Sequence, residues 1–289
     1  MSAGVSDDAP IAAAPVVVDF ARPELNDVQQ RALAALRRDG IVVLRFHDLL
    51  GEKLLREAVA EIEGFVRSAE AKAQTVGDRP VKKESLIISR FDRIGRGRKL
   101  PKPTFPLENV WVRVGTSELL LDIVNSYRER FLRLCYLDNW FTIPYPRTEE
   151  RVLSQQWHRD PEDEHVIKVF LYLSDVDAHA GPFEYIRSSA TGGRYGDLWP
   201  WGESKRYPPS DSLTARVAKE DRLVVTGPAG TLIVCDTGGF HRGGFARTKP
   251  RVLATWTYIG PDARKSNRQF AIADESLEHL LPQARFALQ

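Results

Sequence analysis

The sequence has few cysteines, no long apolar run and almost no net charge. Its two cysteines, Cys135 and Cys235, both lie in apolar, strand-like stretches, which argues against a disulfide framework or a cysteine-based zinc site and favours a reducing cytoplasm. The apolar stretch 11–18 is short and contains Pro15, so neither a signal peptide nor a membrane span is expected. With 41 basic and 39 acidic residues the formal charge is only +2, so nucleic acid is not an expected partner.

Apolar residues are plentiful enough for one large core. They make up 43% of 289 positions, a length near the upper end of what one domain usually holds. We therefore expect a single domain over residues 21–289. The Ala-rich residues 1–20 have no periodicity and are expected to be a flexible N-terminus. No feature of the sequence indicates the oligomeric state.

Helical periodicity is concentrated in the first half of the chain. Apolar residues fall on one side of a helix that begins at Asn26, and Gly40 is a typical residue to end it. Similar spacing predicts helices over 52–72 and 117–133, and a short strand is expected over 41–46. We expect the N-terminal helices to pack on one face of a sheet.

The second half of the chain is rich in β-branched and aromatic residues, interrupted by Gly, Pro and Asp. Eight strands at this spacing predict a mainly β protein, namely a double-stranded β-helix (jelly roll) with flanking α-helices and a core over about 135–260. The expected strands are 135–143, 151–157, 166–173, 183–187, 222–226, 230–236, 240–246 and 251–259.

Two segments outside the expected strands have the character of lids. Basic residues dominate 79–102 within a segment of about 79–105, which is either a solvated loop or a cover that attracts an anionic or many-hydroxylated substrate. The second segment, about 188–216, is long for a loop in one domain, and loops of this length are usually functional. Its Trp199 and Trp201 either close over a bound molecule or anchor the loop.

A metal site is predicted from three residues. His158 and Asp160 are two apart at the end of an expected strand, so both side chains can point to the same side. His241 lies between pairs of glycines at the start of a later strand, where the backbone can approach closely. One carboxylate and two imidazoles suit a divalent iron that keeps coordination positions open.

Arg251 stands ten residues after His241, at the head of the strand RVLATWTYI. Its planar guanidinium can grip a carboxylate at two points, which predicts 2-oxoglutarate as a second ligand of the iron and leaves one position for O2. Lys168 alternates with Phe170 and Tyr172, so we expect it inside the fold, neutralising the co-substrate or the substrate, unless the register is shifted by one. Candidate substrate contacts are Gln156, Trp157, Trp199 and Trp201.

The chain resembles the phytanoyl-CoA dioxygenase-like branch of the iron(II)/2-oxoglutarate oxygenases. The resemblance runs from LRRDGIVVLRF through WHRD, KVFLYLSDVDAHAGPFEYI and GGFHRGG to KPRVLATWTY. It implies that His158, Asp160 and His241 hold iron and that Arg251 holds 2-oxoglutarate. Two departures affect secondary contacts: residues 186–189 read Ile-Arg-Ser-Ser where the family often has Gly-Ser-His, and Gly243 replaces a polar residue.

The resemblance implies a dioxygenase that hydroxylates, desaturates or cyclises a small, polar metabolite, in a natural-product tailoring pathway. Because Asp160 retains the carboxylate that related halogenases have lost, halogenation is disfavoured. Two alternatives stay open: a cupin-type jelly-roll metalloenzyme that does not use 2-oxoglutarate, and a non-catalytic metal-binding module. The identity of the substrate does not follow from the sequence.

Overall fold

The computed structural model describes residues 20–76, 86–91, 94–95, 98–145, 151, 153–200, 207–263, 267–274 and 276–289. The expected flexible residues 1–19, much of the basic segment 79–102, and Trp201 lie outside the described residues.

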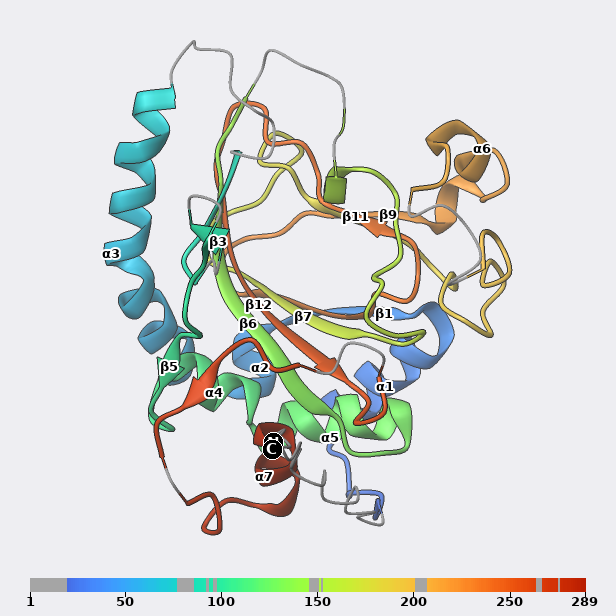
Figure 1. The fold of residues 1–289 in the computed structure, drawn as a ribbon. Helices are drawn as coiled ribbons and strands as arrows, with labels where there is room; N and C mark the ends of the chain where they lie inside the picture. Colours follow the sequence, from blue (N-terminus) through green and yellow to red (C-terminus); the bar gives the residue numbers. More distant parts are fainter. Residues whose placement is uncertain are drawn as a thin grey trace, which may run out of the picture.

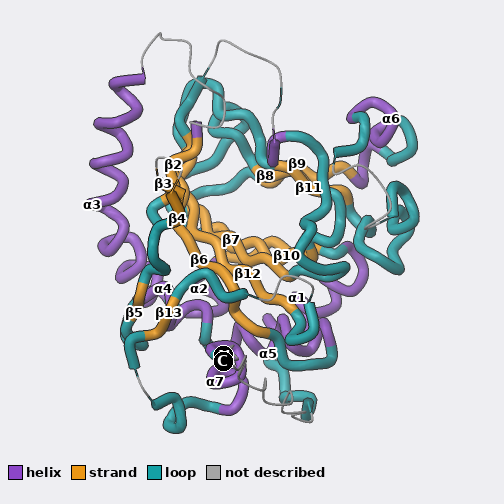
Figure 2. The backbone as a smooth tube through the Cα atoms, viewed as in Figure 1, coloured by secondary structure: helices purple, strands orange, loops and turns teal. Residues whose placement is uncertain are grey.

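Two antiparallel sheets form the centre of the fold, and Figure 2 shows them as separate groups of strands. The large sheet has the order β1-β10-β7-β12-β6-β2 and the small sheet the order β11-β8-β9. The large sheet consists of β1 (Ile41–Arg45), β2 (Ile87–Ser89), β6 (Arg133–Thr142), β7 (Ile167–Tyr172), β10 (Thr231–Asp236) and β12 (Arg251–Ile259). The small sheet consists of β8 (Phe183–Ile186), β9 (Arg222–Val225) and β11 (His241–Arg242). Two short pairs complete the strands: β3 (Ile94–Gly95) with β4 (Arg98–Lys99), and β5 (Thr104–Phe105) with β13 (Ala271–Ile272).

Helices cover the outer face of the large sheet, as Figure 1 shows for α3, α2 and α5. They are α1 (Asp27–Asp39), α2 (Phe46–Leu50), α3 (Glu52–Val76), α4 (Val110–Gly115), α5 (Glu118–Arg128) and α7 (Pro282–Leu288), while α6 (Ser210–Thr214) lies on the opposite side of the molecule. Outward residues of the sheet, such as Val169, Val234 and Trp256, share one buried cluster with Leu36 and Ile62 of the helices. The predicted packing of N-terminal helices on one sheet is therefore confirmed. None of the described helices is both long enough and apolar enough to cross a membrane.

The ends of the first helix follow the capping pattern of its sequence. The side chain of Asn26 accepts a hydrogen bond from the Gln29 amide, and the Gln29 side chain accepts one from the Asn26 amide. Gly40 ends the helix with φ of 75°, a conformation that glycine adopts without steric cost. The helix expected over 117–133 is too long, because the chain leaves α5 at Glu129, which is left-handed with φ of 50°.

The strand predictions succeed where apolar residues are continuous and fail near the expected metal site. β12 has the bounds that the sequence predicts. The strand expected over 151–157 is wrong, since residues Leu153–Gln155 form a short 3-10 helix, η2, that begins at a left-handed Leu153. The strand expected over 240–246 is reduced to β11, because Gly243 and Gly244 offer no side chains for packing.

The two faces of the small sheet have different neighbours. Phe183 and Tyr185 of its inner face share one buried cluster with Phe170 of the large sheet. The loop after β8 packs on its outer face, where Tyr195 and Leu213 join a separate apolar cluster. This described part of the segment 188–216 is an anchored layer, and its predicted role as a lid stays a prediction. A second short 3-10 helix, η3 (Lys219–Asp221), leads from this layer into β9.

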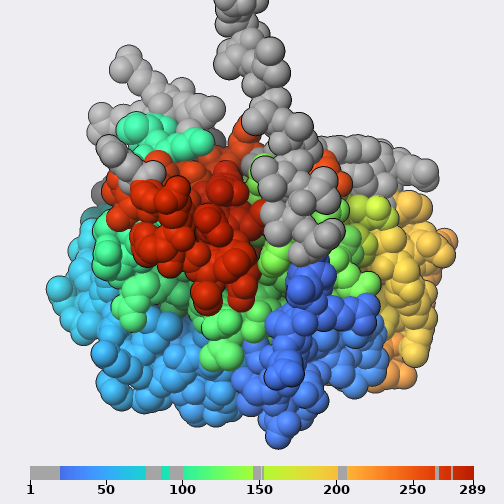
Figure 3. Space-filling view, turned by 90° about the horizontal axis from the view of Figure 1, so that it is seen from below, coloured from blue at the N-terminus to red at the C-terminus, as the bar shows by residue number. Residues whose placement is uncertain are grey.

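Segments from both ends of the chain meet on the face that is seen from below. Figure 3 shows the first described residues (blue) and the C-terminal segment (red) on this face, together with residues from the middle of the chain (green). Phe131 connects them, with its ring 5.5 Å from that of Phe20 and 5.6 Å from that of Phe286. This contact closes the fold on the side away from the small sheet.

Candidate metal centre

Backbone hydrogen bonds hold the two ligand-bearing segments side by side. The amide of His158 donates to the carbonyl of His241, and the amide of His241 donates back to His158, both at 3.1 Å. The amide of Asp160 donates to the carbonyl of Thr237 at 3.0 Å. This antiparallel bridge is short, but it fixes the segment 158–160 against the residues that lead into β11.

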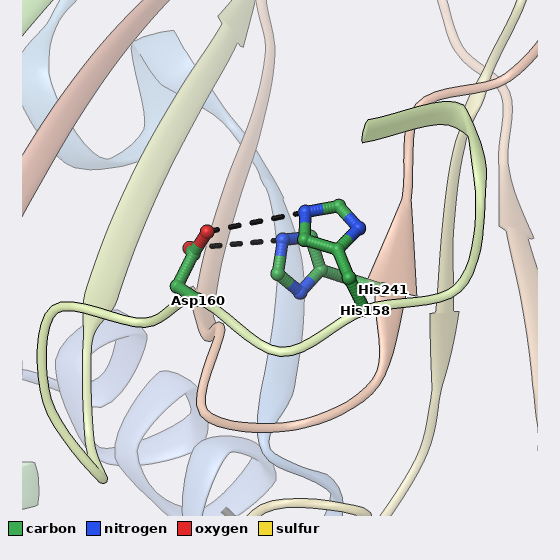
Figure 4. Close-up of side chains that lie close together, drawn as sticks. All are labelled: His158, Asp160 and His241. Atoms are coloured by element: carbon green, nitrogen blue, oxygen red, sulfur yellow. Dashed lines mark ion pairs between the residues drawn. The ribbon is translucent and has the colours of Figure 1, made fainter. Parts of the chain in front are cut away.

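The side chains of His158, Asp160 and His241 converge, as the sequence predicts (Figure 4). All three are buried, and one candidate ligand atom from each lies within 4.8 Å of the others. Nε2 of His158 is 3.9 Å from Oδ1 of Asp160, and Nε2 of His241 is 3.6 Å from Oδ2. The donor set matches the two-His, one-carboxylate arrangement that is typical of non-haem iron(II).

In both imidazoles Nδ1 is hydrogen-bonded to a backbone carbonyl, and Nε2 points to Asp160. Nδ1 of His158 lies 2.8 Å from the carbonyl of Gln156, and Nδ1 of His241 lies 3.0 Å from the carbonyl of Gly239. A carbonyl only accepts hydrogen bonds, so each Nδ1 carries the proton and each Nε2 keeps its lone pair. Carbonyl partners of this kind orient the histidine ligands of metals.

The surroundings of the centre favour an ionised Asp160 and a neutral His241. Burial by itself would raise the pKa of Asp160, but Lys168 and the two histidines together lower it well below its usual value. Burial, followed by the neighbouring His158, lowers the pKa of His241 to about 3. Both side chains are therefore in the protonation state that a divalent cation requires.

Lys168 lies inside the fold, and its partner is a candidate metal ligand. Lys168, Phe170 and Tyr172 all line one cavity, so the register predicted for β7 is confirmed. Nζ of Lys168 lies 2.7 Å from Oδ2 of Asp160. In this structure the ammonium neutralises the carboxylate of Asp160, and its contact with a co-substrate stays a prediction.

The same cavity extends from the two histidines to Arg251, which is only 4% exposed. One Nη of Arg251 donates to the carbonyl of Gly181, while its Nε has no partner among the described residues. Thr142 lies directly opposite Arg251 in the pairing of β6 with β12, and its buried hydroxyl also lacks a partner in the described part of the chain. Two unsatisfied polar groups in a closed space are a favourable place for a carboxylate.

Glycines around His241 are required by close backbone contacts. A β-carbon on Gly239 would collide with the hydroxyl of Tyr185, and one on Gly244 would collide with the carbonyl of Pro182. Gly243 is different, because a β-carbon there would make only ordinary van der Waals contacts, 3.7 Å from the carbonyl of Ser154 and 3.8 Å from Nη2 of Arg251. The expected close approach is confirmed, and Gly243 enlarges the cavity beside the arginine.

The predicted substrate contacts are not gathered in this cavity. Its lining includes Gln155 but neither Gln156 nor Trp157 nor Trp199. The side-chain Nε2 of Gln156 donates to the carbonyl of Arg151, and the other two side chains belong to the apolar cluster outside the small sheet. Their contact with substrate stays a prediction, and that of Trp201 lies outside the described residues.

Three residues near the centre were missed by sequence reasoning. Tyr207 lies beside His158, with ring centroids 6.0 Å apart, and no spacing signal indicates this approach. Thr142 could have been found from the pairing of β6 with β12. Arg159 could have been found too, because it alternates with the two ligands and must point to the other side of the chain.

No protein-family model and no curated protein sequence matches the chain. Several solved structures do resemble it. One is the epimerase SnoN in complex with Fe3+, alpha-ketoglutarate and nogalamycin RO. The match to SnoN has a TM-score of 0.52 and 16% identity, and it covers 82% of this chain and 85% of SnoN. HygX from Streptomyces hygroscopicus, with nickel, 2-oxoglutarate and hygromycin B bound, has a TM-score of 0.51 and 14% identity over 81% of this chain and 88% of HygX. EctD from S. alaskensis, with 2-oxoglutarate and 5-hydroxyectoine, has a TM-score of 0.52 and 19% identity over 89% of this chain and 79% of EctD.

At these identities the comparison establishes the fold. The chain has the jelly-roll fold that these enzymes share, so the predicted fold class is confirmed. The narrower resemblance to the phytanoyl-CoA dioxygenase-like branch stays a prediction. The function has to be argued from the site itself.

Proposed function

We propose that this protein is an iron(II)- and 2-oxoglutarate-dependent dioxygenase in which His158, Asp160 and His241 hold the iron. The observation that carries the proposal is the convergence of two imidazole Nε2 atoms and one carboxylate in a buried site, with both Nδ1 atoms already hydrogen-bonded to carbonyls. Iron, 2-oxoglutarate and O2 together would supply the oxidising power to break a C–H bond of the substrate.

Arg251 and Thr142 are the proposed anchor for the far carboxylate of 2-oxoglutarate. Both have an unsatisfied, buried polar atom, and both line the cavity that also contains the two histidines. Phe170 and Leu253 supply apolar wall between these two ends. A five-carbon diacid suits such a space, because its charged ends are separated by a short carbon chain.

The residues of the chain would act by orientation and by exclusion of water. The carbonyls of Gln156 and Gly239 fix the two imidazole rings, and Lys168 keeps Asp160 charged before metal binds. The rings of Phe183 and Phe170, tilted against each other with centroids 5.0 Å apart, line the cavity with apolar surface that would keep water from it. Dry surroundings strengthen the electrostatic interactions inside the site.

The proposed substrate is a small, polar metabolite, and hydroxylation is the proposed reaction, ahead of desaturation and cyclisation. Support comes from the similar fold of proteins that bind nogalamycin RO or hygromycin B, which also favours a role in natural-product tailoring. We propose residues 21–289 as a single catalytic domain. The reducing cytoplasm is its proposed compartment, since Cys135 and Cys235 are both free thiols.

The test is to add Fe(II) and 2-oxoglutarate to the metal-free protein without oxygen and to record the visible absorption of the chelate. We expect an absorption band that needs both additions, and formation of succinate once O2 is admitted. Asp160→Ala should abolish the band. Arg251→Leu should retain metal binding but weaken 2-oxoglutarate binding by roughly 2–5 kcal/mol, because a buried charge contact is lost.

Other outcomes would reject the proposal in favour of a named alternative. Tight metal binding with no band and no succinate would indicate a cupin-type enzyme that does not use 2-oxoglutarate. If the protein bound no metal at all, both the 2-oxoglutarate-dependent dioxygenase and the cupin-type metalloenzyme would be contradicted.

A further inference from the structure

Arg159 lies between two candidate metal ligands, yet its side chain points away from them. Side chains alternate along an extended segment, so His158 and Asp160 converge with His241 at the metal centre while Arg159 faces the layer outside the small sheet. There Arg159 is 8% exposed, and its guanidinium lies 4.0 Å from the ring centroid of Phe240. A buried arginine with no direct part in binding metal needs another explanation.

The contacts of Arg159 are almost entirely with main-chain carbonyls. A guanidinium has five N–H donors in a fixed plane, and here they all find acceptors. No carboxylate in the described part of the chain forms an ion pair with it. Its acceptors are the carbonyl oxygens of Ser189, Tyr195, Gly196, Leu198, Trp199 and Gly238.

These carbonyls belong to two separate segments. Five of them lie in the loop 189–199, and the sixth, Gly238, lies three residues before His241. The guanidinium therefore joins the loop to both segments that carry ligand side chains. The loop has left-handed residues near its two ends, Ser188 with φ of 52° and Trp199 with φ of 46°, so its shape is maintained by these internal contacts.

We propose that Arg159 is a positioning residue that couples the loop 189–199 to the metal centre. By holding Gly238 against its own segment, it fixes the separation of His158 and Asp160 from His241. The inference rests on the proposed iron site, and it adds that the outer loop and the bound metal stabilise each other. Lysine cannot fill the role, because an ammonium has only three donors and no planar fork.

A coupling of this kind works in both directions. If metal binding tightens the contact between the segments 158–160 and 238–241, it also reduces opening of the loop that shares the guanidinium. If the loop loses its anchor, the ligand segments separate more easily and the metal is held less tightly. A residue that only anchored the loop would produce neither effect.

The experiment uses Co2+ alone as the probe and hydrogen exchange of the loop amides as a readout independent of catalysis. In the wild-type protein, Co2+ should slow exchange over 189–199. In Arg159→Lys, Co2+ affinity should fall about 10-fold, as for other partners of metal ligands, and loop exchange should be fast with or without Co2+. Far-UV circular dichroism checks that the variant is folded.

Arg216→Lys is the matched control, because the Arg216 guanidinium packs on the ring of Trp199 at 5.4 Å and has no contact with the ligand segments among its described interactions. It should behave as the wild type. The inference is overturned if loop exchange in the wild type is insensitive to bound Co2+, a measurement that needs no variant. It is also overturned if Arg159→Lys binds Co2+ with unchanged affinity. A wild type that binds no Co2+ would instead refute the proposed metal site.

Discussion

The outer faces of the two sheets are covered in opposite ways. Helices cover the large sheet, and the contact is made by apolar side chains such as Val169, Trp256 and Ile62. A loop covers the small sheet, and a single guanidinium, that of Arg159, holds much of its backbone. One layer depends on buried apolar area, whereas the other depends on hydrogen bonds to carbonyls.

The candidate functional side chains are likewise divided between the two sheets. His241 lies on β11 of the small sheet, and His158 and Asp160 lie on the segment bridged to it. The large sheet contributes Arg251 and Lys168 from its inner face. Stability should therefore respond most to changes under the helices, and metal affinity most to changes around the small sheet.

Trp256→Ala should produce the largest loss of stability. Trp256 is fully buried under α4, its Nε1 donates to the carbonyl of Trp111 at 2.7 Å, and the two indole rings are 6.0 Å apart. Removing such a side chain costs about 3–5 kcal/mol, measurable by urea unfolding. Co2+ affinity of the folded variant should remain that of the wild type, and an equally large loss of affinity would show that the two layers are not separable.

Gly239→Ala should lower both the stability of the protein and its affinity for Co2+, because the position has no room for a β-carbon. The added β-carbon would collide with the hydroxyl of Tyr185, which donates to the carbonyl of Asp236 at 2.8 Å. Forced overpacking costs roughly 1–3 kcal/mol, and here it should also weaken Co2+ binding because His241 is displaced. Gly243→Ala is the control, since its β-carbon has room. Equal effects of the two substitutions on unfolding and on metal binding would contradict this account.

Lys168→Met should strengthen metal binding. The ammonium of Lys168 lies 2.7 Å from Oδ2 of Asp160, so a metal that binds this oxygen has to compete with it. Removing that competitor should improve Co2+ affinity about 10-fold, within the usual range of coupling between sites. Lys168→Arg retains the charge and serves as the control. If 2-oxoglutarate binding collapses while Co2+ affinity is unchanged, Lys168 contacts the co-substrate, as the sequence first indicated.

The same comparison explains what could be predicted from the sequence. Under the helices, apolar periodicity decides both packing and secondary structure, so the bounds of β12 and the helix that ends at Gly40 are confirmed. The ligands were found because HxD, a glycine-flanked histidine and an arginine have a fixed order. Periodicity fails at Leu153 and after His241, where left-handed backbone and glycines replace side-chain packing.

Contacts with the backbone leave no trace in the spacing of side chains. The acceptors of Arg159 are carbonyls of unremarkable residues such as Ser189 and Leu198, so no pattern in those residues indicates them. Tyr207 approaches His158 by a ring contact between segments far apart in the sequence, and no residue spacing indicates that contact either. The sequence therefore predicts which residues hold the metal better than it predicts which residues hold the ligands in place.

Gly64→Ala should give the smallest effect, a gain in stability. Gly64 lies inside α3 and has nothing within 4 Å of an added β-carbon, so alanine improves helix propensity by roughly 0.5–1 kcal/mol. Gly51 is an equally open position, but its φ of 82° makes alanine strained. Gly51→Ala should therefore lower the urea midpoint where Gly64→Ala raises it, and neither should alter Co2+ affinity. If both substitutions shifted the urea midpoint in the same direction, the space around the added β-carbon, rather than the backbone conformation, would determine the effect of alanine at these two positions.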